Sequence, residues 1–455
     1  MDRVLTTLLS CIFAGSLFAA SVPGEYIVKL PEELAPTTEN FEEIVGQDVV
    51  SFTRLFNSQY KVTVDGQVDL SQPRLSNVHI QPNYIYEIAL DRSQTKLLPR
   101  GVFPRMEEEY TTTANDPLIR SQWGLQHSKA LQAWGRTRGN SEIVVAVLDT
   151  GVDTGHEDLN GNIWINREEI AGNGIDDDEN GYIDDTKGWD FANNDNDPYD
   201  TMSEPRIMGN PGHGTHCAGV VGAVGNNSKG ISGVSPNVKI MSLRFITEEG
   251  QGTTESAIEA IKYAVDNGAR VISNSWGGQE DRNNPDQALI DVIEYARDHD
   301  VLMIFAAGNG DQSGNGFDND SAAEPVVPSS YQMDNILSVA AIDVNDSLAP
   351  FSNWGRNSVD IGAPGVQIMS TVPDTSSKYE DQITIFGFPV APWSGTSMAT
   401  PHVAGAAALL LSIDHKLSYM ELKDALLNSV RQTSSLNGKV TTGGVLDITN
   451  ALDQL

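Results

Sequence analysis

Three short motifs contain side chains that can take part in acid–base and nucleophilic chemistry. Asp149 ends an apolar run and precedes Thr-Gly, His213 opens the run His-Gly-Thr-His-Cys-Ala-Gly, and Ser397 lies in Ser-Gly-Thr-Ser-Met-Ala-Thr-Pro-His. Taken singly, each has an ordinary structural explanation: a turn aspartate, a core histidine and a serine that caps a helix. Zinc is a poor alternative for the histidine motif because the HExxH pattern is absent.

Together, the three residue types form a catalytic unit. A serine hydroxyl is a weak nucleophile until a histidine removes its proton, and that histidine needs a carboxylate to fix its tautomer. A fourth motif, Ala-Ala-Gly-Asn309-Gly, follows another apolar run. An amide held there can donate a hydrogen bond to an anionic tetrahedral intermediate, and a helix that begins near Ser397 offers free N–H groups beside it.

These four motifs, in this order and with these flanking residues, resemble the subtilisin family of serine proteases from position 116 to about position 450. The resemblance implies that Asp149 orients the base, His213 is the general base and acid, and Ser397 is the nucleophile. It also implies that Asn309 and the backbone N–H of Ser397 form the oxyanion hole. An α/β-hydrolase is disfavoured because Ala399 stands where its GxSxG motif requires glycine.

Two segments resemble the substrate-binding surface of that family, and they imply polypeptide substrates. One resembles the strand that pairs with an extended substrate, an arrangement in which main-chain hydrogen bonds give affinity and side pockets give preference. It comprises Ser275, Trp276, Gly277 and Gly278, and the facing segment includes Ala307 and Gly308. The segment 318–331 departs from the family pattern and carries acidic residues, namely Asp318, Asp320 and Glu324. We hypothesise from these residues that the enzyme prefers substrates with basic side chains.

The resemblance further implies a calcium site built from oxygen ligands, which suit this hard cation. Its side-chain ligands would be Asp116, Asp158 and Asn227, and its backbone carbonyls would come from Gly225, Lys229 and Ile231. Calcium bound there would stabilise the folded protein by mass action.

A second candidate calcium site comes from the sequence pattern itself. The spacing D-x-D-x-N-G-x-x-D, which opens an EF-hand-like loop, is formed by Asp176, Asp178, Asn180 and Asp184. Lys187 replaces the glutamate that closes an EF-hand, so a complete EF-hand is excluded. A shorter calcium loop and a solvated acidic loop both remain open, in a stretch that carries 15 acidic and 2 basic residues between positions 156 and 206.

The elements that position these motifs follow an alternating pattern. Apolar runs predict strands at 143–148, 239–244, 271–273, 301–306 and 336–341, and amphipathic segments predict helices at 254–267 and 286–298. Near-continuous apolar strands between helices are typical of a parallel sheet covered on both faces, with catalytic groups at the carboxyl ends of its strands. We therefore expect an α/β fold, and the resemblance implies a subtilisin-like three-layer domain with a mostly parallel sheet over residues 116–455.

Residues 22–89 are expected to form a small α+β unit. Strands are predicted at 25–30, 60–64 and 78–89, the last one broken by Pro82, and a helix begins near Phe41. The unit resembles the ferredoxin-like propeptide of the family, which assists folding and inhibits its own enzyme with its tail. The resemblance places the first cut near Ala89–Leu90, and residues 90–115 are expected to be a linker that is trimmed away.

Residues 1–21 resemble an export signal. Arg3 precedes 17 uncharged residues, fewer than the ~20 that span a bilayer, and small residues follow. A lipoprotein signal at Cys11 would leave an unusually short apolar core, and a buried N-terminal helix is a weaker alternative. We expect a secreted or periplasmic protein without a stable membrane span.

Composition limits the function classes further. The 39% hydrophobic and 20% charged residues are typical of a globular chain, and the net charge of −33 disfavours nucleic-acid binding. With Cys11 removed, only Cys217 remains, so a mature extracellular protein would depend on its core and bound ions for stability. We predict a monomeric serine endopeptidase made as an autoprocessed zymogen; an inactive peptide-binding relative and an esterase are the alternatives.

Overall fold

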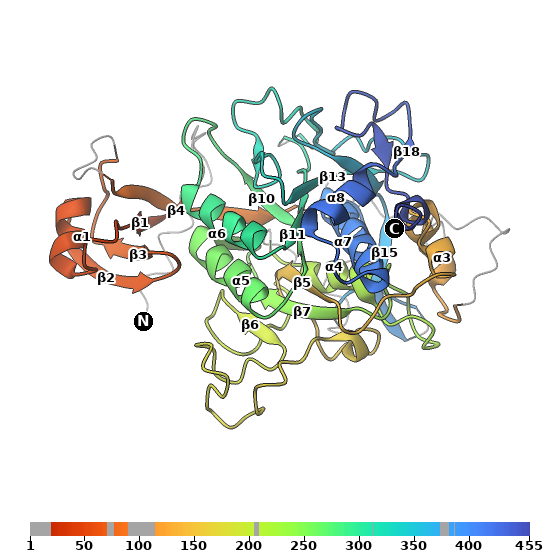
Figure 1. The fold of residues 1–455 in the computed structure, drawn as a ribbon, viewed down its shortest axis with the longest axis horizontal. Helices are drawn as coiled ribbons and strands as arrows, with labels where there is room; N and C mark the ends of the chain where they lie inside the picture. The colour runs from red at the N-terminus through yellow and green to blue at the C-terminus, as the bar shows by residue number, and fades with distance from the viewer. Residues whose placement is uncertain are drawn as a thin grey trace.

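The computed structural model describes residues 20–70, 77–89, 114–203, 209–311, 313–373, 382–385 and 387–455. The predicted export signal, apart from its last two residues, and nearly all of the predicted linker lie outside this part of the chain. Figure 1 shows a small N-terminal unit at one end of the molecule and a much larger unit beside it.

A nine-stranded sheet forms the centre of the larger unit, in the order β18-β19-β14-β13-β11-β9-β5-β7-β6. Its neighbouring strands are parallel except for the pair β18/β19. In that order the strands span Arg431–Gln432, Gly444–Val445, Ile361–Pro364, Ile336–Ile342, Leu302–Ala306, Val271–Asn274, Val144–Asp149, Lys239–Arg244 and Gly188–Asp190. The five predicted strands are all present, with ends that differ by no more than one residue.

Helices cover both faces of this sheet. Val145 and Val147 of β5 pack in one core cluster, which includes α4 (His213–Gly222), α7 (Thr396–Ile413) and α8 (Tyr419–Leu427). The alternate residues Ala146 and Leu148 pack in a second cluster, which includes α5 (Thr254–Asp266) and α6 (Gln287–Asp298). The result is three layers, helix–sheet–helix, as the sequence predicts (Figure 1).

Helix α7 is apolar on all sides because it lies inside the protein. It is the one helix in the described part of the chain that is long and apolar enough to cross a membrane, and 89% of that segment is buried against the sheet and its neighbours. Shorter elements surround it: η3 (Ile119–Ser121), α2 (Trp123–His127), α3 (Ala130–Ala133), η4 (Asn160–Asn162), α9 (Ile448–Leu452) and an antiparallel sheet of β15 (Ile368–Thr371), β17 (Phe388–Trp393) and β16 (Ile383–Ile385).

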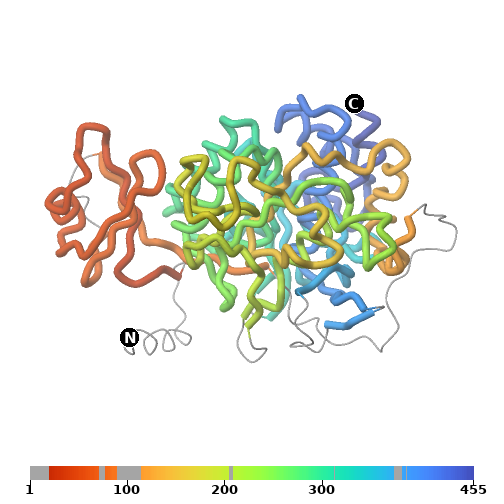
Figure 2. The backbone as a smooth tube through the Cα atoms, turned by 90° about the horizontal axis from the view of Figure 1, so that it is seen from below, coloured from red at the N-terminus to blue at the C-terminus, as the bar shows by residue number. Residues whose placement is uncertain are grey.

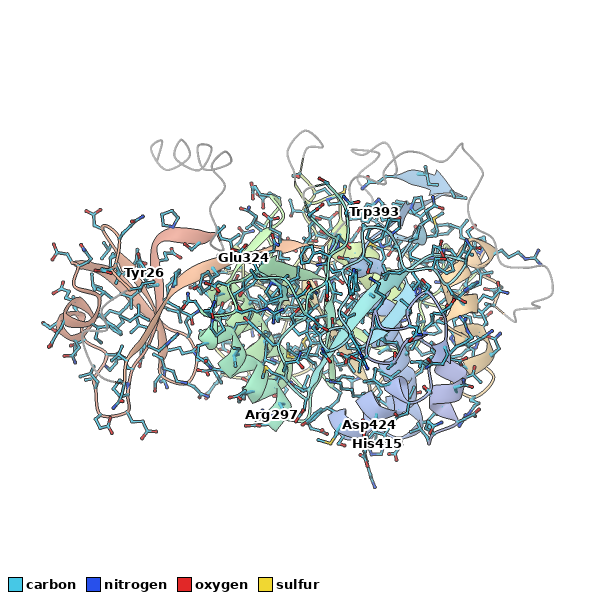
Figure 3. All side chains as sticks on the ribbon, turned by 90° about the horizontal axis from the view of Figure 1, so that it is seen from above. Tyr26, Arg297, Glu324, Trp393, His415 and Asp424 are labelled. Carbon is cyan, nitrogen blue, oxygen red and sulfur yellow. The ribbon has the colours of Figure 1, made fainter. Side chains whose placement is uncertain are left out.

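The N-terminal unit has a helix and four antiparallel strands with a core of their own. The chain order is β1 (Ser21–Lys29), α1 (Thr38–Val45), β2 (Val49–Arg54), β3 (Gln59–Val64) and β4 (His79–Ile88). Figure 3 labels Tyr26 within this unit. Thr37 caps α1 by accepting the N–H of Asn40, and Gly46 ends it in a left-handed conformation.

The expectation that Pro82 breaks the last strand is wrong, because β4 continues through it. In the part of the chain that the structure describes, β1 is the one strand that pairs with β4 at Pro82, where the register partner is Tyr26. A proline that lacks its N–H is tolerated where a strand has no second neighbour.

Strand β4 joins the two units, because its last residues leave the N-terminal sheet and enter the larger unit (Figure 2). There it lies between β8 (Gln251–Thr253) and β10 (Trp276–Gln279), antiparallel to both. Strand β10 pairs in turn with β12 (Val326–Val327). One sheet thus extends across both units.

Candidate active site

Asp149 and His213 form a buried pair at the carboxyl end of the central sheet. Asp149 is the last residue of β5 and His213 the first residue of α4, and neither side chain is exposed. The distance from His213 Nδ1 to Asp149 Oδ1 is 2.7 Å, and the N–H of Thr150 donates to the same oxygen. This bond fixes the imidazole so that Nε2 is free to exchange a proton.

Ser397 and Asn309 meet at one carbonyl group, that of Ala89, which directly follows β4. Ser397 lies in the first turn of α7, and Asn309 follows the end of β11. Ser397 Oγ and Asn309 Nδ2 both hydrogen-bond to the Ala89 carbonyl oxygen. His213 Nε2 is buried and has no hydrogen-bond partner among the described residues.

The orientation of the Asn309 amide follows from its other contacts. Its Oδ1 accepts the backbone N–H of Thr396 at 2.8 Å and the Thr396 hydroxyl at 3.0 Å. The amide nitrogen must therefore point away from Thr396 and toward Ala89. A donor fixed in this way stabilises negative charge on a carbonyl oxygen without having to reorient.

The segment that leads to Ala89 is held like an extended peptide. The Ala89 N–H donates to the Ser275 carbonyl at 3.1 Å, and β4 pairs with β10 through Ile88↔Trp276 and Glu87↔Gly277. On its other side Tyr86 pairs with Gly252 of β8. This is strand addition by the chain's own β4, and the substrate-binding role of the Ser275–Gly278 segment stays a prediction.

Ala307 and Gly308 directly precede Asn309 in the chain. Ala307 is buried, and Gly308 has a φ of +106°, which favours glycine. A Cβ on Gly308 would lie 2.7 Å from Asn353 Nδ2 and 2.8 Å from Val326 Cγ2. The chain therefore reaches Asn309 through a turn in which a side chain has no room.

Asp200 is a buried carboxylate near the Asp149–His213 pair, and no sequence motif points to it. Its oxygens accept the hydroxyls of Thr150 and Thr215, the Thr215 N–H and the Asn210 amide. Asn210 Oδ1 in turn accepts the N–H of His213 at 2.9 Å. Burial raises the pKa of Asp200 to about 6. Asp200 thus ties the end of β5 to the start of α4, and it lies in an acidic run that gives no sequence signal for this role.

Two other side chains near His213 are structural. His216 donates to the carbonyls of Ile368 and Ala391, its ring stacks on Trp393 at 4.6 Å, and burial lowers its pKa to about 3 (Trp393 is labelled in Figure 3). Cys217 Sγ lies 3.9 Å from His213 Nδ1, is fully buried, and has a pKa that burial raises well above its usual value. Neutral groups of this kind belong to the core.

The structure brings Asp116, Asp158 and Asn227 together. Asp116 accepts the N–H groups of Asn226 and Asn227, and Asp158 accepts the Asn227 amide and the N–H of Ile231. Burial, together with the charge of Asp116, raises the pKa of Asp158 to about 6. A Cβ on Gly230 would lie 2.3 Å from Asp158 Oδ2, so the 225–231 loop wraps closely around this carboxylate. Two buried carboxylates that both accept hydrogen bonds from Asn227 suit a cation.

The acidic loop gathers a different set from the one its spacing predicts. Carboxylate oxygens of Glu169, Asp178 and Asp185 all lie within 4.8 Å of one another. Asn180 donates to Asp178 and Asp185. Asp176 and Asp184 instead accept backbone N–H groups of their own loop, from Asn180 and Gly181 and from Gly172, Asn173 and Gly174. Glu169 and Asp185 lie outside the sequence pattern, because one precedes the motif and the other follows it.

The acidic segment around Asp318 is used for its own folding. Asp318 accepts the N–H of Asp320, and Asp320 accepts two N–H groups of Asn357. The backbone carbonyl of Glu324 accepts a hydrogen bond from the Gln279 side-chain amide. Glu324 is labelled in Figure 3. The preference for basic substrates therefore stays a prediction.

Comparisons with known proteins give one consistent result. Residues 140–445 match the sequence model of the subtilase family. The thermophilic serine proteinase of Bacillus sp. (strain AK1) is 33% identical over 399 residues, 86% of this chain and 79% of the relative. Thermitase of Thermoactinomyces vulgaris is 39% identical over 301 residues, 66% of this chain and 86% of the relative.

A solved structure has the same fold. The crystal structure of fervidolysin from Fervidobacterium pennivorans, described as a keratinolytic enzyme related to subtilisin, matches with a TM-score of 0.71 and 24% identity. The match covers 95% of this chain and 61% of the fervidolysin chain.

Proposed function

This chain belongs to the subtilase family of serine endopeptidases, and we propose that Ser397, His213 and Asp149 are its catalytic triad. Ser397 Oγ attacks a peptide carbonyl carbon while His213 Nε2 takes the hydroxyl proton. Asp149 stabilises the resulting imidazolium through the Nδ1–H bond of 2.7 Å. Asn309 Nδ2 and the Ser397 N–H stabilise the oxyanion.

The proton and the leaving group then follow a balanced course. As the C–N bond breaks, His213 gives its proton to the departing amine, and an ester remains on Ser397. Water attacks that ester, one of its protons passes to His213, and that proton returns to Ser397 Oγ as the carboxylic acid product leaves and ionises in solvent. His213 thus carries each proton that is exchanged with Ser397.

The first bond cut is Ala89–Leu90 of the same chain, so the protein is an autoprocessed zymogen whose N-terminal unit inhibits it. One observation carries this proposal: the Ala89 carbonyl is the group that Ser397 and Asn309 both contact. Pairing of β4 with β8 and β10 supports it, because an inhibitory tail needs the binding mode of a substrate. Residues 1–21 are removed on export, and residues 90–115 are trimmed afterwards.

Calcium is the proposed structural cofactor, and it stabilises the fold without entering the reaction. Asp116, Asp158 and Asn227, with the carbonyls of Gly225, Lys229 and Ile231, would hold one ion. Glu169, Asp178 and Asp185 are the best-placed ligands for a second. In both places buried or half-buried carboxylates gather, which supports a bound divalent ion.

Processing of the whole chain tests the proposal. Wild type, Ser397→Ala and the control Ser412→Ala, which changes a serine elsewhere on α7, are expressed in calcium-containing buffer. Each product is followed on a denaturing gel and by mass spectrometry of its N-terminus. We expect wild type and Ser412→Ala to shorten to a species that begins at or after Leu90, while Ser397→Ala loses only its signal.

Two outcomes would count against the proposal. Identical shortening of all three proteins would mean that a host protease does the cutting. No shortening of any of them, together with no cleavage of casein, would favour the inactive peptide-binding relative.

A further inference from the structure

The side chain of Tyr86 fills a pocket of the larger unit. Counting back from Ala89, Tyr86 is the fourth residue before the proposed cleaved bond, and it is 2% exposed, whereas the neighbouring Glu87 faces solvent. Its ring packs edge-on against Trp276 at 5.3 Å. The missing side chain of Gly278 leaves room for it, since a Cβ there would lie 3.2 Å from the ring.

A carboxylate lies at the end of this pocket. The Tyr86 hydroxyl donates to Asp286 Oδ2 at 2.8 Å, and the Thr254 hydroxyl donates to the same oxygen at 2.6 Å. The other oxygen, Oδ1, accepts the N–H of Leu289 and the Gln81 amide. Asp286 is fully buried in this arrangement.

Asp286 belongs to the enzyme and not to the propeptide. It caps the N-terminus of α6 through its bond to Leu289, and its own N–H donates to Glu280 at 2.7 Å. These contacts, and the bond from Thr254, lie within the larger unit and remain when β4 departs. Tyr86 and Gln81 leave with the propeptide, so the pocket of the mature enzyme offers a fixed acceptor at its end.

We propose that this pocket selects substrates with tyrosine four residues before the cleaved bond, and that Asp286 determines this specificity by accepting the phenol hydroxyl. The inference rests on the proposed function, because it takes Ala89 as the residue whose carbonyl is attacked. Phenylalanine packs against Trp276 in the same way, but it leaves the buried Oδ2 of Asp286 with the Thr254 hydroxyl alone, in place of two donors. A site built around a hydrogen bond discriminates strongly against an analogue that lacks it.

The experiment compares internally quenched peptides cut by the mature enzyme. The parent peptide has the sequence of residues 82–93, and its variants replace Tyr86 with Phe, Leu or Lys, or Glu87 with Gln. We expect kcat/KM to be about tenfold higher for tyrosine than for phenylalanine, and the Glu87→Gln peptide to match the parent. Cleavage after Ala89 is checked by mass spectrometry.

Two enzyme variants locate the effect. Asp286→Asn keeps a helix-capping residue but removes the charge, and Asp281→Asn makes the same change on the same loop without contact to Tyr86. The tyrosine-to-phenylalanine ratio is expected to fall to within about threefold of unity in the first variant and to stay as in wild type in the second. If Asp286→Asn does not fold, the peptide series on wild type decides alone.

The outcomes separate this inference from the proposed function. Equal kcat/KM for tyrosine and phenylalanine, or a preference for lysine, would overturn the inference while the peptidase assignment stands. Cleavage of casein but of no peptide in the series would also overturn it. If neither casein nor any peptide is cut by the processed chain, the proposed function fails and the inference fails with it.

Discussion

Asp149 and His213 come from a strand end and a helix start, and a third segment holds these two ends together. Asp200 accepts four hydrogen bonds, from Thr150, Thr215 and Asn210, and Asn210 accepts the N–H of His213. Asp200 touches neither substrate nor reacting atoms, so its role is to position the residues that do.

We expect Asp200→Asn to lower kcat about 10- to 100-fold with little change in KM, because charge-assisted hydrogen bonds are worth ~1.5–3 kcal/mol each. Steady-state kinetics with a peptide substrate measures the two constants, and circular dichroism verifies the fold. The exposed Asp195→Asn is the matched control. An unchanged kcat in Asp200→Asn would show that the network is only structural.

Cys217 gives a second prediction at this scale. A mercury compound bound to Sγ, 3.9 Å from His213 Nδ1, would displace the imidazole and inactivate the enzyme. Inactivation should be slow, because the thiol is fully buried and its pKa is raised. Residual activity over time is the readout, and Cys217→Ala should resist. Equal loss in both proteins would mean that the reagent acts elsewhere.

The identities of the proposed catalytic residues could be predicted from the sequence because their motifs are local. Asp200 could not, since its role depends on residues 150, 210 and 215 folding around it. The same reason applies to Asp286: four donors converge on it from β4, the start of α5 and its own helix. Nothing in its neighbouring sequence points to a pocket.

At the scale of elements, the strongest predictions concern strands buried on both faces. Residues 301–306 and 336–341 are all apolar or small, and strands β11 and β13 match them to within one residue at each end. Strand β2 was not predicted, because Val49–Arg54 is only half-buried and mixes polar with apolar residues. The short β8 gives no periodic signal in three residues, yet it pairs with β4 on the side away from β10.

Calcium removal tests how the loops around Asp158 are held. A bound ion at 100 times its Kd adds about 2.7 kcal/mol, so removing one ion by chelation is expected to lower Tm by roughly 4 °C. Calorimetry with and without chelator measures the shift. Asp158→Asn should remove the contribution of the first site and Asp185→Asn that of the acidic loop.

The control is Glu157→Gln, which changes an exposed carboxylate beside Asp158 that pairs with Lys229 at the surface. Its response to chelator should equal that of wild type. A chain whose Tm is indifferent to chelator in every variant would contradict the calcium proposal.

At the scale of the whole molecule, the N-terminal unit docks through polar contacts as well as through β4. Lys61 of β3 forms an ion pair with Glu255 of α5 at 2.6 Å. Glu259 of α5 and Glu25 of β1 belong to the same charge cluster, since both act on Lys61. Burial and the charge of Glu255 together raise the pKa of Glu259 from 4.5 to about 7, while Lys61 opposes the shift.

This cluster predicts that the cleaved N-terminal unit is released faster as pH rises. A carboxyl group whose pKa is raised in the docked state stabilises docking when it is protonated. Its contribution is complete below the ordinary pKa of 4.5 and is lost as pH rises through the docked-state pKa of about 7. Release rates followed by size-exclusion chromatography between pH 5.5 and pH 8 measure it. Glu259→Gln should flatten the profile; a slope that persists unchanged in this variant would place the titrating group elsewhere.

Departure of β4 leaves a slot one strand wide between β8 and β10, lined on both sides by unpaired backbone groups. Only an extended segment of at least three residues can hydrogen-bond to both strand edges. Helices, and strands already paired in a sheet, therefore cannot bind there without first unfolding locally. The conformation of a target should therefore limit its digestion as much as its sequence does. Native globular proteins would be nicked at loose loops, and the same proteins would be consumed rapidly once heat or acid has opened them.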